Sequence, residues 1–214
     1  MRLLPQNDQL RALHTAIRDR DATREDFVHY SRRIIRLLLE EAMNLLPFEE
    51  KKVTTPVGET YAGLAFASPL CGVSVLRAGE SMEAELRAMH PGIRIGKILI
   101  QRDRSTKLPR LYFASLPPDV ASCHVLLLEP MLATGGSALA ALDVLARAGV
   151  SIERIVLVAF LASPQALGAI TTAHPALNVV TSAVEDGLDE NAYMLPGIGD
   201  FGDRYFGTQD TGAR

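Results

Sequence analysis

The sequence predicts an α/β protein in which helices flank a mainly parallel sheet. The first observation is a series of largely apolar runs that are too short for helices and typical of strands buried on both faces. These runs cover residues 71–76, 95–101, 125–128, 155–161 and 179–184. The second observation is that helical segments separate several of the runs, which is the pattern of a parallel sheet. With 214 residues, 48% of them hydrophobic, residues 1–214 are predicted to form one domain.

Residues 1–50 are predicted to contain two helices. Leu10, Leu13 and Ile17 recur at the spacing of one helical face. The second helix should begin at Thr23, which forms a capping box with Asp26. Several arginines lie in this region, but acidic residues alternate with them, so a solvated face is predicted rather than a site. These arginines are Arg18, Arg20, Arg24, Arg32, Arg33 and Arg36.

Two hairpins are expected. The first pairs residues 53–55 with residues 61–66 around a turn at Gly58. The second lies within residues 101–118, where a polar, charged segment separates the run at 95–101 from residues 111–116. This second hairpin would form an arm or flap over one end of the sheet, and a mobile cover of this kind can exclude water from a reactive intermediate.

Residues 126–150 carry the most informative pattern. The apolar run ends at Glu129, the small residues 134–137 follow, and a helix over 138–148 is predicted, with Ser137 as its cap and Gly149 at its end. Glycines let backbone N–H groups surround an anion, and a helix N-terminus adds partial positive charge. An acid beside such a cradle suits a ribose phosphate; a Gly-Gly turn that merely allows tight packing is the alternative. No Walker lysine follows Ser137, which argues against a nucleoside triphosphatase.

Arg77 follows the run at 71–76 and precedes the small residues Ala78 and Gly79. Its planar guanidinium suits phosphate oxygens, although a surface arginine before a turn is an equally good interpretation of these residues alone. Because ligands in parallel sheets bind beyond the carboxyl ends of the strands, Arg77 and the Glu129 loop are expected to meet at one edge.

The segment after residue 186 breaks the strand–helix alternation and is rich in glycine. A plain surface wrap is one interpretation. The other is a binding segment that presents main-chain N–H and C=O groups to a small planar ligand, walled by aromatic side chains. The aromatic residues available are Tyr193, Phe201, Tyr205 and Phe206.

Four segments, in collinear order, resemble the uracil phosphoribosyltransferases. They are VLRAGESM (75–82), KILIQRD (97–103), EPMLATGGS (129–137) and PGIGDFGDRYFGT (196–208). One departure is Glu129, where the family usually has Asp. The resemblance implies a type I phosphoribosyltransferase fold with a flexible flap at 101–118 and a base-binding hood at 186–208. It also implies the reaction of uracil with 5-phosphoribosyl-1-pyrophosphate (PRPP) to give UMP and diphosphate, a step of pyrimidine salvage.

The resemblance also implies roles for individual residues. Arg77 and Arg102 would bind the pyrophosphate, Glu129 the ribose hydroxyls and residues 134–137 the 5′-phosphate; related enzymes often have a cis peptide beside the first arginine. The implied PRPP-binding residues are Arg77, Arg102, Glu129, Pro130, Met131, Leu132, Ala133, Thr134, Gly135, Gly136, Ser137 and Asp200. Those implied for uracil are Met194, Gly199, Asp200 and Phe201. The implied catalytic residues are Arg102 and Asp200.

Composition excludes several other functions. The formal charge of −3 gives no basic footprint, which argues against nucleic-acid binding and against an RNA-binding regulator of the same fold. The hood sequence argues against hypoxanthine or orotate as the base. Cys71 and Cys123 are expected to be buried thiols in a reducing compartment.

Cofactor, assembly and location complete the expectations. The five histidines show no metal-ligand spacing, so Mg²⁺ is expected to arrive with PRPP rather than at a protein metal site. No signal peptide or membrane span is apparent, and a cytoplasmic location is expected. The expected assembly is a homodimer or homotetramer, and GTP is left open as an effector.

Overall fold

A mainly parallel sheet forms the centre of the computed structural model, which describes residues 1–102, except for the side chain of Arg102, and residues 109–208. In spatial order its strands are β1 (Arg2–Leu3), β10 (Asn178–Val184), β9 (Ile155–Ala162), β7 (His124–Leu128), β4 (Leu70–Leu76), β5 (Arg94–Arg102) and β6 (Pro109–Ser115), and β8 (Met131–Leu132) pairs with β9. Within the described residues, β6 is the one antiparallel strand of this sheet. The predicted fold class is confirmed.

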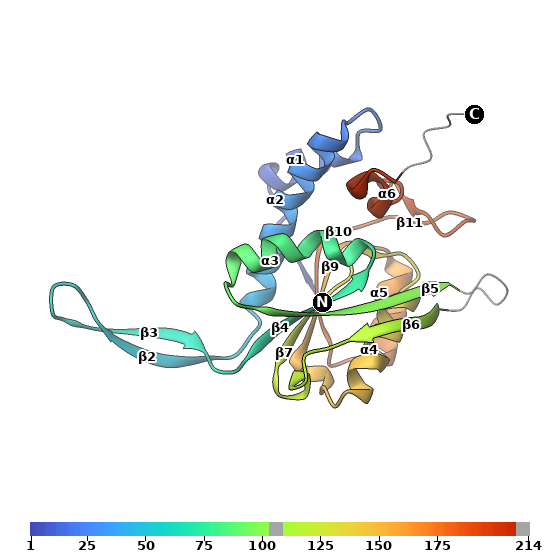
Figure 1. Ribbon diagram of the computed structural model, residues 1–214. Helices are drawn as coiled ribbons and strands as arrows, with labels where there is room; N and C mark the ends of the chain where they lie inside the picture. Colours follow the sequence, from blue (N-terminus) through green and yellow to red (C-terminus); the bar gives the residue numbers. More distant parts are fainter. Residues whose placement is uncertain (103–108, 209–214) are drawn as a thin grey trace.

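Helices cover both faces of the sheet (Figure 1). On one face lie α1 (Asp8–Arg18), α2 (Arg24–Met43) and α3 (Glu83–Met89); on the other lie α4 (Gly136–Arg147) and α5 (Pro164–Ala173). Alternate residues of a strand point to opposite faces, so Leu126 and Leu128 join the first core while Val125 and Leu127 join the second. Both faces of the central strands are therefore buried, as their continuous apolar runs predicted.

Local capping interactions start and end the helices. Asn7 Oδ1 accepts the N–H of Leu10 at 2.9 Å, and Thr23 Oγ1 accepts the N–H of Asp26 at 3.1 Å, which confirms the predicted start of α2. The prediction for α4 was wrong at its start. The helix begins at Gly136, after Gly135 in the left-handed conformation (φ +79°), and Ser137 lies inside the first turn instead of capping it. Gly149 ends α4 with φ +85°, as predicted.

Arg32 and Arg36 are about half exposed, as a solvated face predicts, but they and the partly buried Arg18 also form ion pairs that the prediction did not include. Arg18 pairs with Glu185, while Arg32 and Arg36 both pair with Glu85. The side chains of both glutamates are fully buried, and a buried carboxylate without a partner is costly. The acids beside the arginines in sequence are therefore not their partners; acids from distant segments are.

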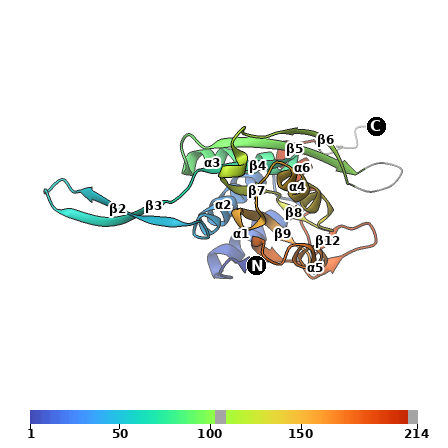
Figure 2. The same cartoon turned by 90° about the horizontal axis from the view of Figure 1, so that it is seen from below.

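The first predicted hairpin is confirmed but is longer than expected. It consists of β2 (Phe48–Thr54) and β3 (Thr60–Phe66) and extends away from the rest of the molecule (Figures 1 and 2). The strands β5 and β6 form the second antiparallel pair, lying side by side in Figure 2. Residues 103–108 between them lie outside the described residues, so the flap over 101–118 stays a prediction.

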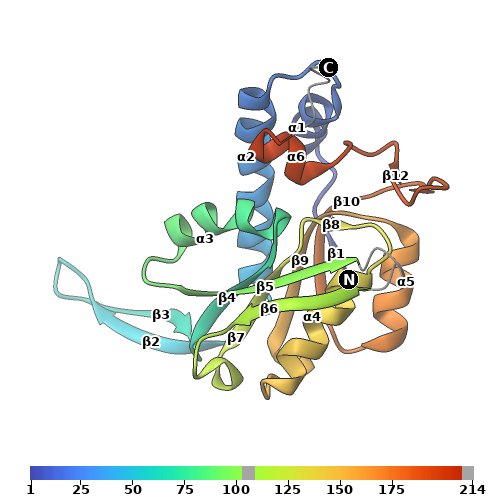
Figure 3. The ribbon, with the colours of Figure 1, turned by 45° about the vertical axis from the view of Figure 1, so that its right-hand side comes forward.

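The hood, residues 186–208, contains a short helix that the glycine-rich pattern did not predict. Its elements are β11 (Gly187–Leu188), β12 (Met194–Leu195) and α6 (Phe201–Phe206). Asp200 caps α6 by accepting the N–H of Asp203 at 2.8 Å. The ring of Phe201 packs against Phe27 and Phe160, with centroids 5.5 and 5.2 Å away, so α6 lies beside α2 (Figure 3).

The remaining elements of the part of the chain that the structure describes are three 3₁₀ turns. They are η1 (Ala78–Met82), η2 (Val120–Ser122) and η3 (Ile152–Arg154).

Cys71 and Cys123 are buried free thiols, as predicted. Across the described part of the chain, no helix combines the length and the apolar character needed to cross a membrane.

Candidate active site

The carboxyl ends of β4 and β7 open into a cleft of about 300 Å³ that the hood covers from the other side. This is the edge at which open parallel sheets bind their ligands. The lining residues are Val75, Leu76, Arg77, Ala78, Ile100, Glu129, Met131, Ala133, Ser137, Ala192, Tyr193, Met194, Gly199, Asp200, Phe201 and Gly202. A smaller pocket of about 50 Å³ adjoins it at Glu129 and is lined by residues 131–138.

The cleft brings together most of the residues singled out from the sequence. Arg77, Glu129 and Ser137 come from the sheet edge, while Met194 and residues 199–201 come from the hood. Residues 132–136 line the smaller pocket. Pro130 lines neither cavity; it is buried, and its carbonyl oxygen accepts the N–H groups of Phe160 and Leu161. Arg102 is the last residue of β5, and its side chain lies outside what the structure describes.

The loop between β8 and α4 has the backbone shape of an anion cradle. Gly135 adopts φ +79°, a backbone conformation that strains any residue with a side chain, and it packs against the backbone of Ala166. Ser163, the N-cap of α5, donates to the carbonyl oxygen of Ala133 at 2.5 Å and fixes the other end of the loop. The N-terminus of the twelve-residue helix α4 then faces the smaller pocket with its partial positive charge.

Glu129 stands between the two cavities in an unusual electrostatic environment. Its Oε2 is buried and has no hydrogen-bond partner among the described residues. Burial raises the pKa of the Glu129 carboxyl from 4.5 to about 8, because water no longer stabilises the charged form. The carboxyl is therefore mostly protonated at neutral pH and has an oxygen ready for a ligand hydroxyl.

Together with the ribose-binding role that the resemblance implies for Glu129, this pKa predicts a pH dependence of PRPP binding. Sugar hydroxyls that donate to Glu129 stabilise its carboxylate, so binding should favour the ionised form and release a proton. With a pKa of about 8, affinity should rise about fivefold between pH 7 and 8 and level off above that range. Titration calorimetry in buffers of different ionisation enthalpy measures both effects. Glu129→Gln should flatten the rise while keeping the titration of the substrate phosphates; an unchanged profile would contradict the assignment.

Arg77 is tied to the hood. It follows a cis Leu76–Arg77 peptide bond, as the resemblance implied. Its Nη1 donates to Thr208 Oγ1 and its Nη2 to Asp203 Oδ1, both at 3.1 Å. The hydrogen bond from Thr208, and to a smaller extent the one from Arg77, holds the pKa of Asp203 below its usual value. The end of β4 and the hood therefore meet through one charged contact at the mouth of the cleft.

Sequence reasoning missed some members of this site. Asp203 and Thr208 were within the hood motif but were not singled out, although a second acid three residues after Asp200 was a visible signal. Ala192 lines the cleft with φ +65°, and no local pattern announced that conformation. In the described residues there is no group of three or more His, Cys, Asp or Glu side chains that could hold a metal ion.

The strand ends of this parallel sheet carry an arginine, an acid and a glycine-rich loop shaped to bind an anion, and the hood lies over them. This combination of fold and site is that of a phosphoribosyltransferase. A solved purine phosphoribosyltransferase from Pyrococcus horikoshii shares the fold at 11% identity, with a TM-score of 0.50 over 73% of this chain and 83% of that one. A solved protein from Aquifex aeolicus matches with a TM-score of 0.86 and 25% identity, covering 98% of this chain and all of that one.

Sequence comparison places the chain more narrowly. The family model for uracil phosphoribosyltransferase matches residues 4–208. A uracil phosphoribosyltransferase from Dictyostelium discoideum is 53% identical over 208 residues, which are 97% of this chain and 96% of that protein. The chain belongs to the uracil phosphoribosyltransferase family.

Proposed function

We propose that the protein transfers the phosphoribosyl group of PRPP to uracil, forming UMP and diphosphate as a step of pyrimidine salvage. The observation that carries the proposal is a cleft in which Arg77, Glu129 and Ser137 lie with residues 199–201 of the hood, next to a smaller pocket lined by residues 134–137. The first group suits a phosphorylated sugar with a pyrophosphate, and the second suits a small planar base. Family membership supports the same assignment.

The geometry suggests how each part would act. The 134–137 loop would hold the 5′-phosphate, Glu129 would accept the ribose hydroxyls, and Arg77 with Arg102 would bind the departing pyrophosphate. The bond to the anomeric carbon would break with oxocarbenium character, so the protein's contribution is positioning and charge stabilisation. Met194 and residues 199–201 would hold uracil so that its N1 faces that carbon.

Asp200 is assigned to the region between sugar and base. Its Oδ1 is engaged as the cap of α6, accepting the N–H of Asp203 at 2.8 Å. That bond fixes the carboxylate at the rim of the cleft. With Arg102 it completes the proposed catalytic pair: the arginine would stabilise the leaving pyrophosphate, and the acid would act on the sugar and base side.

Phosphoribosyltransferases generally use Mg²⁺ together with PRPP, and we propose that the ion arrives with this substrate. The residues present fit that arrangement, since Glu129 carries a buried carboxyl oxygen without a partner and Asp200 lies across the cleft. Mg²⁺ keeps several waters and is typically bound by one or two carboxylates plus substrate phosphates. When bound it would neutralise charge on the pyrophosphate.

The test of the proposed function is a direct assay. The protein is incubated with PRPP, Mg²⁺ and either uracil, hypoxanthine or orotate, and diphosphate release and nucleotide formation are measured. We expect diphosphate and UMP with uracil and no nucleotide with the other two bases. Nucleotide formed from hypoxanthine or orotate in preference to UMP would overturn the proposal.

A pair of substitutions tests the proposed role of Glu129. Glu129→Asp should retain turnover, because the carboxylate still offers two accepting oxygens, whereas Glu129→Gln offers one and should raise the KM for PRPP. Losing one such hydrogen bond costs about 1.5–3 kcal/mol, which is roughly a 10- to 150-fold loss in kcat/KM. Steady-state kinetics of the two variants checks this above pH 8, where the wild-type carboxyl is ionised. If the Gln variant has full activity and wild-type PRPP affinity, Glu129 does not bind the sugar.

We also propose a homodimer or homotetramer, a cytoplasmic location and GTP as an effector to be tested. The resemblance to the family supports these assignments. Light scattering measures the assembly, and adding GTP to the uracil assay measures activation. A protein that stays monomeric at all concentrations would contradict the proposed assembly. Turnover that does not change with GTP would contradict the proposed effector.

A further inference from the structure

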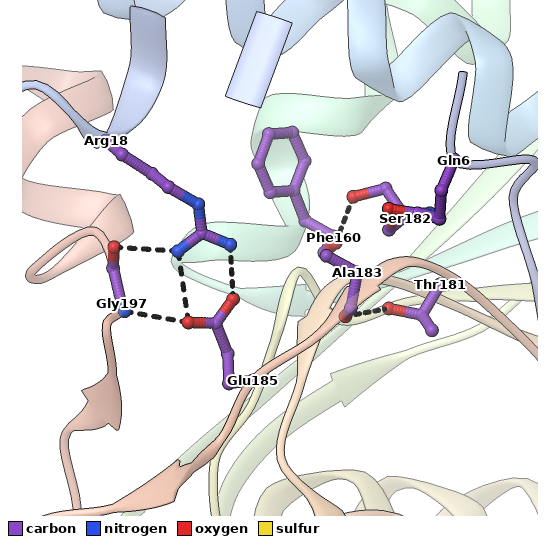
Figure 4. Close-up of polar contacts among 8 residues, drawn as sticks. All are labelled: Gln6, Arg18, Phe160, Thr181, Ser182, Ala183, Glu185 and Gly197. Atoms are coloured by element: carbon purple, nitrogen blue, oxygen red, sulfur yellow. Dashed lines mark hydrogen bonds and ion pairs between the residues drawn. The ribbon is translucent and has the colours of Figure 1, made fainter. Parts of the chain in front are cut away.

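The hood is fastened to the end of α1 by a closed ring of hydrogen bonds (Figure 4). Arg18 uses both terminal nitrogens on the carboxylate of Glu185, and its Nη1 also donates to the carbonyl oxygen of Gly197 at 3.0 Å. The Gly197 N–H donates back to Glu185 Oε2 at 2.7 Å. Burial opposes the ionisation of Glu185, but Arg18 and this N–H hold its pKa below the ordinary value. Both main-chain groups of Gly197 are therefore engaged by one ion pair, in which Glu185 is buried and Arg18 is partly exposed.

A second arginine fastens the next residue to the same helix end. Arg204 donates from Nη1 to the carbonyl oxygens of Ile17 and Ile198, at 2.6 and 3.0 Å, and from Nη2 to that of Asp19 at 2.8 Å. Its guanidinium lies 4.2 Å from the centre of the Phe27 ring. The last carbonyl groups of a helix have no partner within the helix and attract cations. The end of α1 thus supplies acceptors that hold the hood.

The two fastened residues come immediately before the proposed base-binding segment. Gly197 and Gly199 have φ of +67° and +73°, and a Cβ on Gly197 would lie 2.1 Å from the carbonyl oxygen of Met194. The glycines allow this turn to adopt its shape, but without the arginine contacts they would also allow the backbone many other conformations. On the far side, the Phe201 ring is packed in the core. Residues 199–200 are therefore a short span held at both ends.

From this arrangement we infer that Arg18, Glu185 and Arg204 are positioning residues for uracil, holding residues 197–198 so that the backbone of residues 199–201 meets the base. The inference rests on the proposed function. None of the three side chains lines the cleft, so they act through the hood. A displacement of about 1 Å in a substrate-positioning element can cost about a hundredfold in rate, so the fastening matters even though it is remote from the reacting atoms.

The inference predicts a selective kinetic effect. The 134–137 loop and Glu129 belong to a different part of the cleft and are held by α5 and the sheet. Arg18→Met should therefore raise the KM for uracil about tenfold or more, while the KM for PRPP, to which this span contributes Asp200 alone, should change several-fold less. Arg18→Lys, which keeps a cation beside Glu185, should recover part of the uracil affinity.

A matched control separates positioning from stability. Gln6 also ties the N-terminal segment to β10, donating to the carbonyl oxygens of Leu4 and Ser182 at 2.8 and 2.9 Å, and among the described residues its side-chain hydrogen bonds involve no residue of the hood (Figure 4). Gln6→Leu should lower the Tm without changing either KM. If Arg18→Met does not fold because Glu185 is left buried and unpaired, Arg204→Lys leaves that pair intact and should raise the KM for uracil in the same selective way.

The outcomes are distinct. Equal changes in both KM values, or a loss of Tm with an unchanged KM for uracil in both arginine variants, would overturn the positioning role and leave a structural one. If the wild-type protein forms no UMP, the proposed function itself fails. If the wild type is active and both arginine variants keep its KM for uracil, only this inference fails.

Discussion

Cytosine should be converted at least about 30-fold less efficiently than uracil, and the difference should reach up to about four decades in kcat/KM. The hood side of the cleft consists of Ala192, Tyr193, Met194, Gly199, Asp200, Phe201 and Gly202. Few of these side chains are polar, so the base edge would be recognised largely by main-chain donors and acceptors. Cytosine replaces a carbonyl of uracil with an amino group and the N3–H donor with an acceptor. Each unpaired buried polar group costs about 1–3 kcal/mol, and two mismatches give the stated range.

Because residues 197–198 are held in place, the backbone should not rearrange to relieve the hydrogen-bond mismatch with cytosine. A backbone held by Arg18 and Arg204 has no rotatable amide with which to match the reversed pattern. Sites built to hydrogen-bond a substrate group reject close analogues strongly for this reason. Competition assays with uracil, cytosine and 5-fluorouracil measure the discrimination. A 5-substituent leaves the recognition edge unchanged, so 5-fluorouracil should be a substrate; comparable turnover of cytosine would show that the base is recognised in another way.

Arg77→Ala should lower kcat/KM for PRPP by one to two decades while the protein stays folded. The side chain is 55% exposed and contacts Thr208 and Asp203 at the mouth of the cleft, so its removal leaves no cavity in the core. Loss of a charge-assisted hydrogen bond to pyrophosphate costs about 1.5–3 kcal/mol, which gives the stated fall in efficiency. Steady-state kinetics with varied PRPP, together with a thermal unfolding curve, tests both parts of the expectation.

Asp203→Asn is the matched control for Arg77. It weakens the contact with the hood but keeps the guanidinium at the end of β4. If Arg77 binds pyrophosphate, this variant should keep most of the PRPP affinity. A well-folded Arg77→Ala protein with near-wild-type kinetics would place Arg77 outside the site. Equal losses in the two variants would show that the hood contact, and not the pyrophosphate, is what Arg77 serves.

Local patterns in the sequence determined the central strands, the start of α2 and the end of α4. These features depend on interactions within about four residues: apolar continuity, a hydroxyl that caps three residues ahead and a glycine that accepts φ > 0. The polarity of parallel strands was enough to predict that Arg77 and Glu129 meet at one edge, and the cleft contains both. The sequence motifs also identified the family.

Other features followed only from the tertiary structure. The hood looked like an irregular wrap, yet residues 201–206 form a helix because Phe201 is buried against Phe27 and Phe160 from distant segments. The long-range ion pairs of the arginines in α1 and α2 could not be foreseen, because the acids beside them in sequence were the visible partners. Arg18 instead pairs with Glu185, 167 residues away.

The raised pKa of Glu129 also followed only from the tertiary structure. An acid after a strand gives no indication of its own solvation; burial of that carboxyl depends on the segments that fold around the end of β7. Short-range capping and backbone preferences are encoded in neighbouring residues and can be seen in the sequence. Burial and charge pairing depend on which distant segments fold together, because the cost of removing a charge from water is met only by the partner that lies beside it in space.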